Sequence, residues 1–319
     1  MIFGRMSPDQ KQSLVEHFLR LEYIVAFCGD GANDCGALEA ADVGISLSTA
    51  EASIAAPLTS QVMNISCVPK VIREGRAALV TSFCCFKFMA LYSVIQFTQS
   101  VLLCYYAGLI SSGQFIYADM VLVVPLALLM NGFKAGTQLV PFQPPSRLIS
   151  KTVLTEVTGF LVLQFVAQVI TFYMARFNPG YVQPDPEDKF NSFEGNGVFF
   201  MSSHIYVIVA LLIAAGKPFR ESLIENKYLL GCASALTLLN VATNFIPDGN
   251  WYTNLFNIQP ISYEYRRITL FIALGLAVVM SLAHFLLFPL FNRFLGVLFP
   301  IKRRSKWQQV EDEFIPRKV

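Results

Sequence analysis

Charged residues are scarce in this chain: Asp, Glu, Lys and Arg make up 14% of its 319 residues, against roughly 25% in soluble domains. The net charge of +2 provides no basic surface of the kind that binds nucleic acid, so we expect no nucleic-acid partner. Hydrophobic residues make up 54% of the sequence. The composition therefore excludes an ordinary soluble enzyme and predicts a protein in contact with membrane lipid.

Two further features are missing. The seven cysteines fall in apolar or globular segments, at spacings that suit neither a disulfide framework nor a metal site. The opening residues MIFGRMSPDQKQSLVEHF contain neither the apolar core nor the cleavage site of a signal peptide. They are typical of the interior of a domain, so we expect an N-terminal part of the same protein to be missing.

Long apolar runs dominate the remainder of the chain. A helix that crosses the membrane needs roughly 20 mostly apolar residues. Six stretches approach or exceed this length: 82–107, 115–133, 153–177, 198–215, 228–246 and 268–291. The sequence therefore predicts a multi-pass bundle of six transmembrane helices over residues 82–292.

The basic residues beside these runs set the expected orientation. Most lie on the side of the N-terminal segment, and the opposite side holds only Arg176, Lys189, Arg266 and Arg267. By the positive-inside rule, both the N-terminal domain and the tail 293–319 are expected in the cytosol. The loop 178–197, rich in Pro, Gly and acidic residues, is expected on the luminal side.

The segment 1–66 alternates helical and strand patterns. Helices are predicted at 7–21 and 33–41, and short strands at 23–28 and 42–48. This alternation favours part of a doubly wound α/β domain with a parallel sheet. A helical stalk over 67–81 then leads into the membrane region.

The stretch FCGDGANDCGAL places two carboxylates where the first strand ends. Asp30 follows the strand directly, and Asp34 lies at the start of the next helix. Chemistry gathers at the carboxyl ends of parallel strands, and carboxylates beside Gly29 and Gly31 suit Mg²⁺. Lys11 could face phosphate oxygens there. Taken alone, GDG is more typical of a plain glycine-rich turn with an N-capping aspartate.

The longer string GDGANDCGAL resembles the hinge signature GDGxNDxxAL of the P-type ATPases, whose phosphorylation domain has a haloacid-dehalogenase-like fold. MSPDQK resembles their phosphate-contacting lysine segment, and VIREGRAAL resembles the stalk leading into their fifth core membrane helix. CGDGANDCGALEAADVGISLS and LVTSFCCFKFMALYSVIQF most resemble the type-five B subgroup, the polyamine pumps of endolysosomal or vacuolar membranes. The six apolar runs would then correspond to core helices five to ten.

This resemblance implies roles for single residues around an aspartyl-phosphate formed from ATP. Asp30 would bind Mg²⁺, and Asp34 would support the same metal site through water. Asn33 would orient the turn that the two glycines shape, and Lys11 would neutralise the phosphoryl group. The whole pump would export a polyamine or another cation from an acidic lumen to the cytosol.

A carboxylate inside an apolar run suggests a transport site, because a charge at the membrane centre costs roughly 2.5–3.5 kcal/mol. Asp119 is the clearest case, with Pro125 on the same run. Tyr92 and Gln96 fall on one helical face of the first run, and they match the polyamine path of the family. Gly113 stands where the family often has a second acid. A side chain snorkelling to the luminal interface is the alternative for Asp119.

Other polar residues in the runs have plainer interpretations. Lys87 and Glu156 lie near span ends, where such side chains reach the interface. His204 and His284 are expected to be helix-packing residues.

The chain has no DKTGT segment, which carries the phosphorylated aspartate of P-type ATPases. It also lacks a nucleotide-binding domain, the TGE-type loop and the first four core helices. We therefore expect the C-terminal portion of a pump, without ATPase activity by itself. A non-catalytic fragment or regulatory partner remains an alternative. A membrane-tethered phosphatase of the dehalogenase-like class is another, although the DxDx(T/V) nucleophile that it requires is absent.

Overall fold

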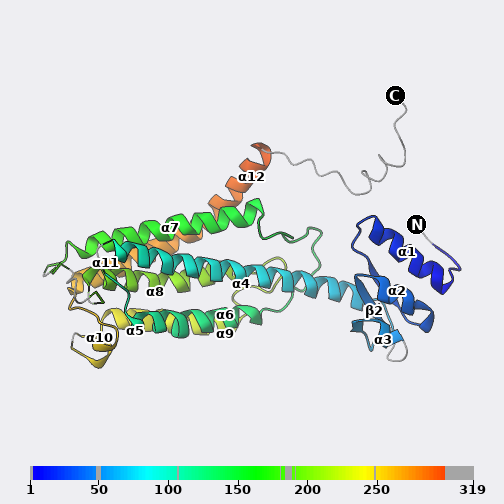
Figure 1. Ribbon diagram of the computed structural model, residues 1–319, viewed down its shortest axis with the longest axis horizontal. Coiled ribbons are helices and arrows are strands. Elements are labelled where there is room, and N and C mark those ends of the chain that lie inside the picture. Colours follow the sequence, from blue (N-terminus) through cyan, green and yellow to red (C-terminus); the bar gives the residue numbers. More distant parts are fainter. Residues whose placement is uncertain are drawn as a thin grey trace. The chain divides into compact units, whose positions relative to one another are not determined.

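The computed structural model describes residues 3–47, 52–105, 108–179, 181–183, 189–190, 192–247 and 249–298. The chain divides into two compact units, with the boundary between Gly75 and Arg76. It is mostly helical, with one small parallel sheet (Figure 1). Of the predicted tail 293–319, residues 299–319 lie outside the described part, as do residues 184–188 of the predicted luminal loop.

The first unit is a small α/β structure. Its elements are α1 (Pro8–Arg20), β1 (Ala26–Gly29), η1 (Ala32–Asp34), α2 (Cys35–Ala40), β2 (Val43–Ser46), α3 (Ala52–Ala55) and β3 (Leu58–Thr59). The sheet has the order β1-β2-β3, and all pairs are parallel. The predicted parallel sheet is confirmed, and β3, which follows the short helix α3, adds a third strand to the two that were predicted.

Local sequence explains how α1 comes to lie beside the end of β1. The Ser7 hydroxyl accepts a hydrogen bond from the Gln10 N–H at 3.3 Å, and the Gln10 side chain accepts one from the Ser7 N–H at 2.9 Å. This capping box starts the helix where the sequence predicts. Helix α1 then packs on α2, and a Cβ on Gly36 would meet the Gln12 Oε1 atom at 2.5 Å. The missing side chain therefore permits the close packing that brings α1 to the site.

The second unit is a helical bundle. Its helices are α4 (Cys67–Cys104, of which residues up to Gly75 belong to the first unit), α5 (Ser112–Ile116), η2 (Tyr117–Val123), α6 (Val124–Leu129), η3 (Met130–Gly132), α7 (Lys151–Ala175), α8 (Phe193–Ile213), α9 (Lys227–Asn244), α10 (Trp251–Leu255), α11 (Tyr263–Leu282), η4 (Ala283–Leu287) and α12 (Phe288–Leu298). Helix α8 packs against α7, α9 and α11 and forms the centre (Figure 1). The other long helices expose many apolar side chains, as a lipid-facing surface requires.

Five helical stretches among the described residues are long and apolar enough to cross a membrane: Cys67–Cys104, Ser112–Gly132, Lys151–Ala175, Phe193–Ile213 and Tyr263–Leu298. They cover five of the six predicted runs. The remaining run, 228–246, is helical as α9 but does not qualify. Lys227, Asn240 and Asn244 lie near its two ends and reduce its apolar character. Helix α9 nevertheless packs against α6 and α8 inside the bundle.

Two of the spans contain a wide, π-helical turn that the sequence analysis did not predict. In η2 the N–H of Val124 donates to the carbonyl of Asp119, five residues back. Pro125 follows directly and has no N–H to give to the preceding turn. The helix therefore accommodates one extra residue beside Asp119.

The second wide turn, η4, has the same cause. Here the N–H of Phe288 donates to the carbonyl of Ala283, and Pro289 follows. This turn carries His284. Each wide turn thus precedes a proline and carries a polar side chain of interest, Asp119 in η2 and His284 in η4, and such turns occur frequently at functional sites.

Candidate functional sites

The loop after β1 brings Lys11 and Asp34 together. The Lys11 ammonium donates to Asp34 Oδ1 at 2.6 Å, and the backbone N–H of Asp30 donates to Asp34 Oδ2 at 3.3 Å. The Asp34 side chain is 9% exposed and that of Lys11 is 31% exposed. Asp34 therefore fixes the lysine at the carboxyl end of the strand and leaves its ammonium accessible to an anion.

Gly29 is the residue that allows this arrangement. An added Cβ would lie 2.6 Å from the Asp34 Cβ and 2.7 Å from its Oδ2. Gly31 differs, because an added Cβ there would meet only the Asn33 nitrogen at 4.0 Å. The two glycines of the GDG sequence thus have unequal roles. Only the first is required by close approach of a neighbouring side chain.

Asp30 and Asn33 have exposed side chains that make no hydrogen bond within the described part of the chain. The structure thus brings together Lys11 and Asp34 but not these two. No cluster of three or more His, Cys, Asp or Glu residues occurs among the residues described. One or two carboxylates beside phosphate oxygens are nevertheless the usual protein contribution to a Mg²⁺ site. The exposed Asp30 carboxylate and the neighbouring Asp34 fit that pattern.

Cys28 precedes this loop on β1. Burial raises the pKa of its thiol above the ordinary value, and neighbouring Cys67, Asp30 and Asp34 act in the same direction. The thiol is therefore kept in its neutral form at pH 7. This argues against a nucleophilic role for it at the site.

Asp119 is the centre of a second site, inside the helical bundle. Its Oδ1 accepts hydrogen bonds from the Tyr92 hydroxyl and from the Gln96 amide, each at 2.7 Å. These contacts join η2 to α4 and hold the carboxylate against its neighbour helix. The three residues predicted for a substrate path therefore meet at one carboxylate oxygen. The side chain lies between helices rather than snorkelling outward.

Tyr206 on α8 is a neighbour that the sequence analysis missed. Its ring centroid is 6.0 Å from that of Tyr92. Its hydroxyl is buried without a hydrogen-bond partner among the described residues. Tyr206 lies within the predicted run 198–215, and no sequence signal distinguished it from an ordinary packing residue.

Asp119 also differs from the two buried glutamates of the second unit in its charge balance. Glu194 pairs with Arg176 at 3.2 Å, and Glu156 pairs with Lys87 at 2.7 Å. No Lys or Arg side chain of the described residues lies within ion-pair distance of Asp119. Its second oxygen, Oδ2, also has no described hydrogen bond. A membrane carboxylate in this state attracts a cation.

The plain interpretation of Lys87 and Glu156 as snorkelling side chains was wrong. Both are only 12% exposed and bind each other, joining α4 to α7. His284, expected only to pack, lies with its Nδ1 3.3 Å from Glu156 Oε1. The pairing was not visible in sequence because the lysine and glutamate are 69 residues apart. Their similar depth, counted from the same side of two neighbouring spans, was the only signal available.

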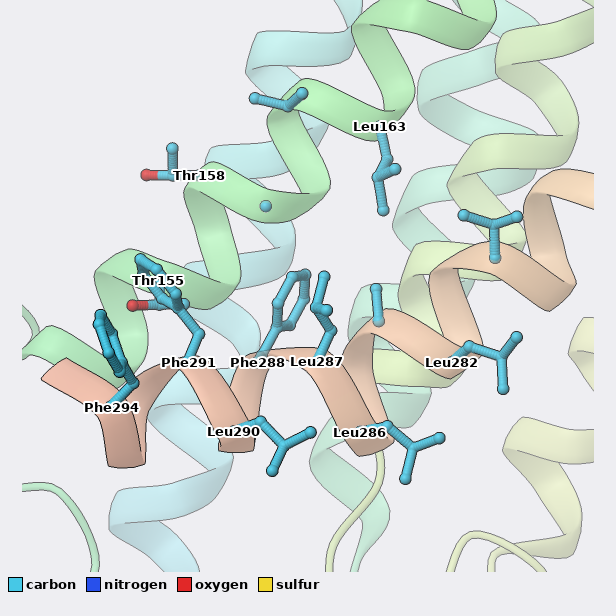
Figure 2. Close-up of a pocket in the computed structure, with 14 residues that line it drawn as sticks. Thr155, Thr158, Leu163, Leu282, Leu286, Leu287, Phe288, Leu290, Phe291 and Phe294 are labelled. Carbon is cyan, nitrogen blue, oxygen red and sulfur yellow. The ribbon is translucent and has the colours of Figure 1, made fainter.

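A cleft of about 980 Å³ is lined by α7 on one side and by the stretch from α11 through α12 on the other. Figure 2 shows Thr155, Thr158 and Leu163 on one wall and Leu287, Phe288 and Phe291 on the other. Its lining has no charged group. The lining is formed mainly by Leu, Val and Phe side chains.

Comparison with known proteins identifies relatives over most of the chain. It is 45% identical over 271 residues to the "Probable cation-transporting ATPase catp-6" of Caenorhabditis elegans, a match that covers 83% of this chain and 21% of the relative. It is 44% identical over 227 residues to the "Vacuolar cation-transporting ATPase YPK9" of Saccharomyces cerevisiae, covering 70% and 15%. It is 37% identical over 298 residues to the human "Polyamine-transporting ATPase 13A3", covering 86% and 24%. No protein-family model matches the chain.

These relatives define a class of membrane proteins, the cation-transporting P-type ATPases. The chain belongs to this class, within the type-five 13A family. It spans about a fifth of the length of the curated relatives that it matches.

Proposed function

We propose that the chain forms part of an ATP-driven transporter and that the transported cation is a polyamine. The observation that carries the proposal is the Asp119 carboxylate, which two neutral donors hold and which no basic side chain of the described residues neutralises. A polyamine is a flexible chain of ammonium groups. The free Asp119 oxygen, the Gln96 amide and the faces of Tyr92 and Tyr206 suit such a ligand. The printed function of the human relative, polyamine transport, supports this class of substrate.

We further propose that the first unit is part of a haloacid-dehalogenase-like phosphorylation domain. The parallel strands and the loop after β1 support this assignment. Lys11, held by Asp34, neutralises phosphoryl oxygens. Asp30 would hold Mg²⁺ directly and Asp34 through water, and the bound ion would neutralise further charge on the phosphoryl group. ATP and the phosphorylated aspartate would belong to parts of the pump outside these 319 residues.

For the membrane region we propose six crossings, with α9 as the fifth. Its packing against α6 and α8 supports a place inside the bundle. The segment 67–81 would be a cytosolic stalk and both termini would be cytosolic. The vacuolar relative supports an endolysosomal or vacuolar membrane, from whose lumen the cation would move to the cytosol. Thiol labelling of single-cysteine variants from each side of sealed vesicles tests this orientation.

The test uses a chimera in which this chain replaces the segment that it matches in the human polyamine-transporting relative. ATP hydrolysis is measured against spermine concentration in the chimera and in its Asp119→Asn variant. Asparagine keeps an oxygen that can accept from Tyr92 and Gln96, so only the charge facing the ligand is lost. A hydrogen bond to a charged group contributes about 1.5–3 kcal/mol. The half-maximal spermine concentration should therefore rise about 10-fold or more.

Glu264→Gln is the matched control, because Glu264 is an exposed carboxylate at the start of α11. It should leave the spermine dependence unchanged. Unchanged stimulation in the Asp119 variant would sink the role given to that residue. Stimulation by an inorganic cation but not by spermine would instead keep the site and exclude the polyamine.

A further inference from the structure

The Lys87, Glu156 and His284 side chains form a cluster that the transport proposal does not use. They come from α4, α7 and η4 and are 12%, 12% and 18% exposed. One Glu156 oxygen, Oε2, accepts from the Lys87 ammonium at 2.7 Å. Ionisable groups inside a membrane bundle are costly unless they are paired, and they commonly mark a functional site.

The second Glu156 oxygen and the imidazole are incompletely satisfied. Glu156 Oε1 and His284 Nδ1 face each other at 3.3 Å. Both atoms are buried, and neither makes a hydrogen bond within the described residues. A structural ion pair would need only the lysine and the glutamate. The third group places a titratable nitrogen beside the second oxygen of a carboxylate whose first oxygen already binds a cation.

We propose that this cluster is a proton-binding site within the bundle, separate from the cation site at Asp119. With a neutral imidazole, Lys87 and Glu156 cancel and the cluster has no net charge. Uptake of one proton from water makes His284 an imidazolium ion with a net charge of one. Its Nδ1–H then donates to Glu156 Oε1, and a charge-assisted hydrogen bond replaces two unsatisfied atoms.

The surroundings make Glu156 the group that governs this proton. Phe160 of α7 stacks on the imidazole, with centroids 5.8 Å apart and planes 17° apart. The charged residues of α11 lie near its start, 17 or more residues before His284, which is about 25 Å along a helix. Arg293 on α12 is exposed. Among the described residues, Glu156 is the charged side chain within ion-pair distance of the ring, and Lys87 binds the other oxygen of the same carboxylate.

Neutral histidine is well suited to this task, because its ordinary pKa places its charge change between pH 5 and 8. Its position on a wide turn also matters. Pro289 directly follows η4 and accounts for the shape of this turn. The backbone around His284 therefore does not have to change when the ring gains or loses a proton.

The experiment is a titration of the full chain in lipid nanodiscs, with isotope-labelled histidine observed by NMR between pH 4 and 9. The chain has three histidines, so a His284→Asn spectrum assigns the ring by subtraction. We expect the His284 signal to titrate as one proton within this range. Glu156→Gln should lower its proton affinity about 10-fold or more, since the opposing charge is lost.

Two further variants keep the result interpretable. Lys87→Met removes the competing cation and should raise the proton affinity, opposite in direction to Glu156→Gln. Glu264→Gln, an exposed carboxylate on α11, should leave it unchanged. Unaltered His17 signals report an intact first unit. A His284 ring that does not titrate would overturn the proposal, as would equal affinities in wild type, Glu156→Gln and Lys87→Met.

Discussion

The unequal roles of the two glycines in the GDG sequence lead to a sharp prediction for Gly29→Ala. An alanine methyl group there would be 2.6–2.8 Å from three atoms of the Asp34 side chain. These distances are shorter than the contacts that methyl carbons make in proteins. Asp34 must rotate away or the strand must shift. Either movement separates the carboxylate from Lys11, which it contacts at 2.6 Å.

The magnitude follows from the contact that is lost. A hydrogen bond between charged groups is worth about 1.5–3 kcal/mol, or about 10- to 150-fold in a rate or equilibrium constant. Lys11 is 31% exposed, so water screens the pair and places the loss at the lower end, about 10-fold. Overpacking adds about 1–3 kcal/mol of instability to the first unit.

The assay is acid-quenched phosphoenzyme formation from ATP in the chimera described above. Gly29→Ala should slow it about 10-fold, whereas Gly31→Ala should stay close to wild type because its methyl group meets only one atom, at 4.0 Å. In a Lys11→Met background, Gly29→Ala should have little further effect, since both changes remove one contact. Equal losses in the two alanine variants, or full additivity with Lys11→Met, would refute the reasoning.

Three more outcomes are expected. Tyr206→Phe removes a buried hydroxyl without a described partner, so it should raise thermal stability or leave it unchanged. A large loss of spermine affinity in the chimera would instead show that this hydroxyl contacts the ligand. Gly159→Ala puts a methyl group into the Phe288 ring, whereas the methyl group of Gly275→Ala meets nothing within 4 Å. Thermal unfolding in nanodiscs should show a loss of about 1–3 kcal/mol for the first variant only. The raised pKa of the Cys28 thiol keeps its thiolate scarce at pH 8. Alkylation of Cys28 should therefore be slower than alkylation of a free thiol, and it should accelerate as the pH rises above 9. An alkylation rate independent of pH would contradict this.

Strong local patterns explain what could be predicted from sequence. A run of about 20 apolar residues has few alternatives to a membrane helix, so most spans were found. Ser7, Pro8 and Gln10 define a helix start through neighbours within one turn, and α1 begins there. Tyr92 and Gln96 both bind Asp119, and all three were selected from sequence for the substrate path. Helical spacing places the first two on one face of the same span.

Contacts between distant segments explain what could not be predicted. The Lys11–Asp34 pair depends on how α1 packs on α2, which no pattern within either helix specifies. The Lys87–Glu156 pair joins two spans and looked like two separate interfacial residues. The apolar content of the run 228–246 also did not show that the buried asparagines of α9 serve helix contacts: Asn240 accepts from the Tyr117 hydroxyl at 2.7 Å.

The wide turn η2 makes the Asp119 site sensitive to chain length at one place. An α-helix advances about 100° per residue, so the additional residue between Tyr117 and Val123 offsets the two ends of this span by about that angle. Deleting one residue after Asp119 would restore a regular helix from the loop to Pro125. The same deletion would turn Asp119 away from α4 toward another face of the helix. Insertions and deletions in this short interval could therefore redirect the cation site while leaving the loops and the length of the span almost unchanged.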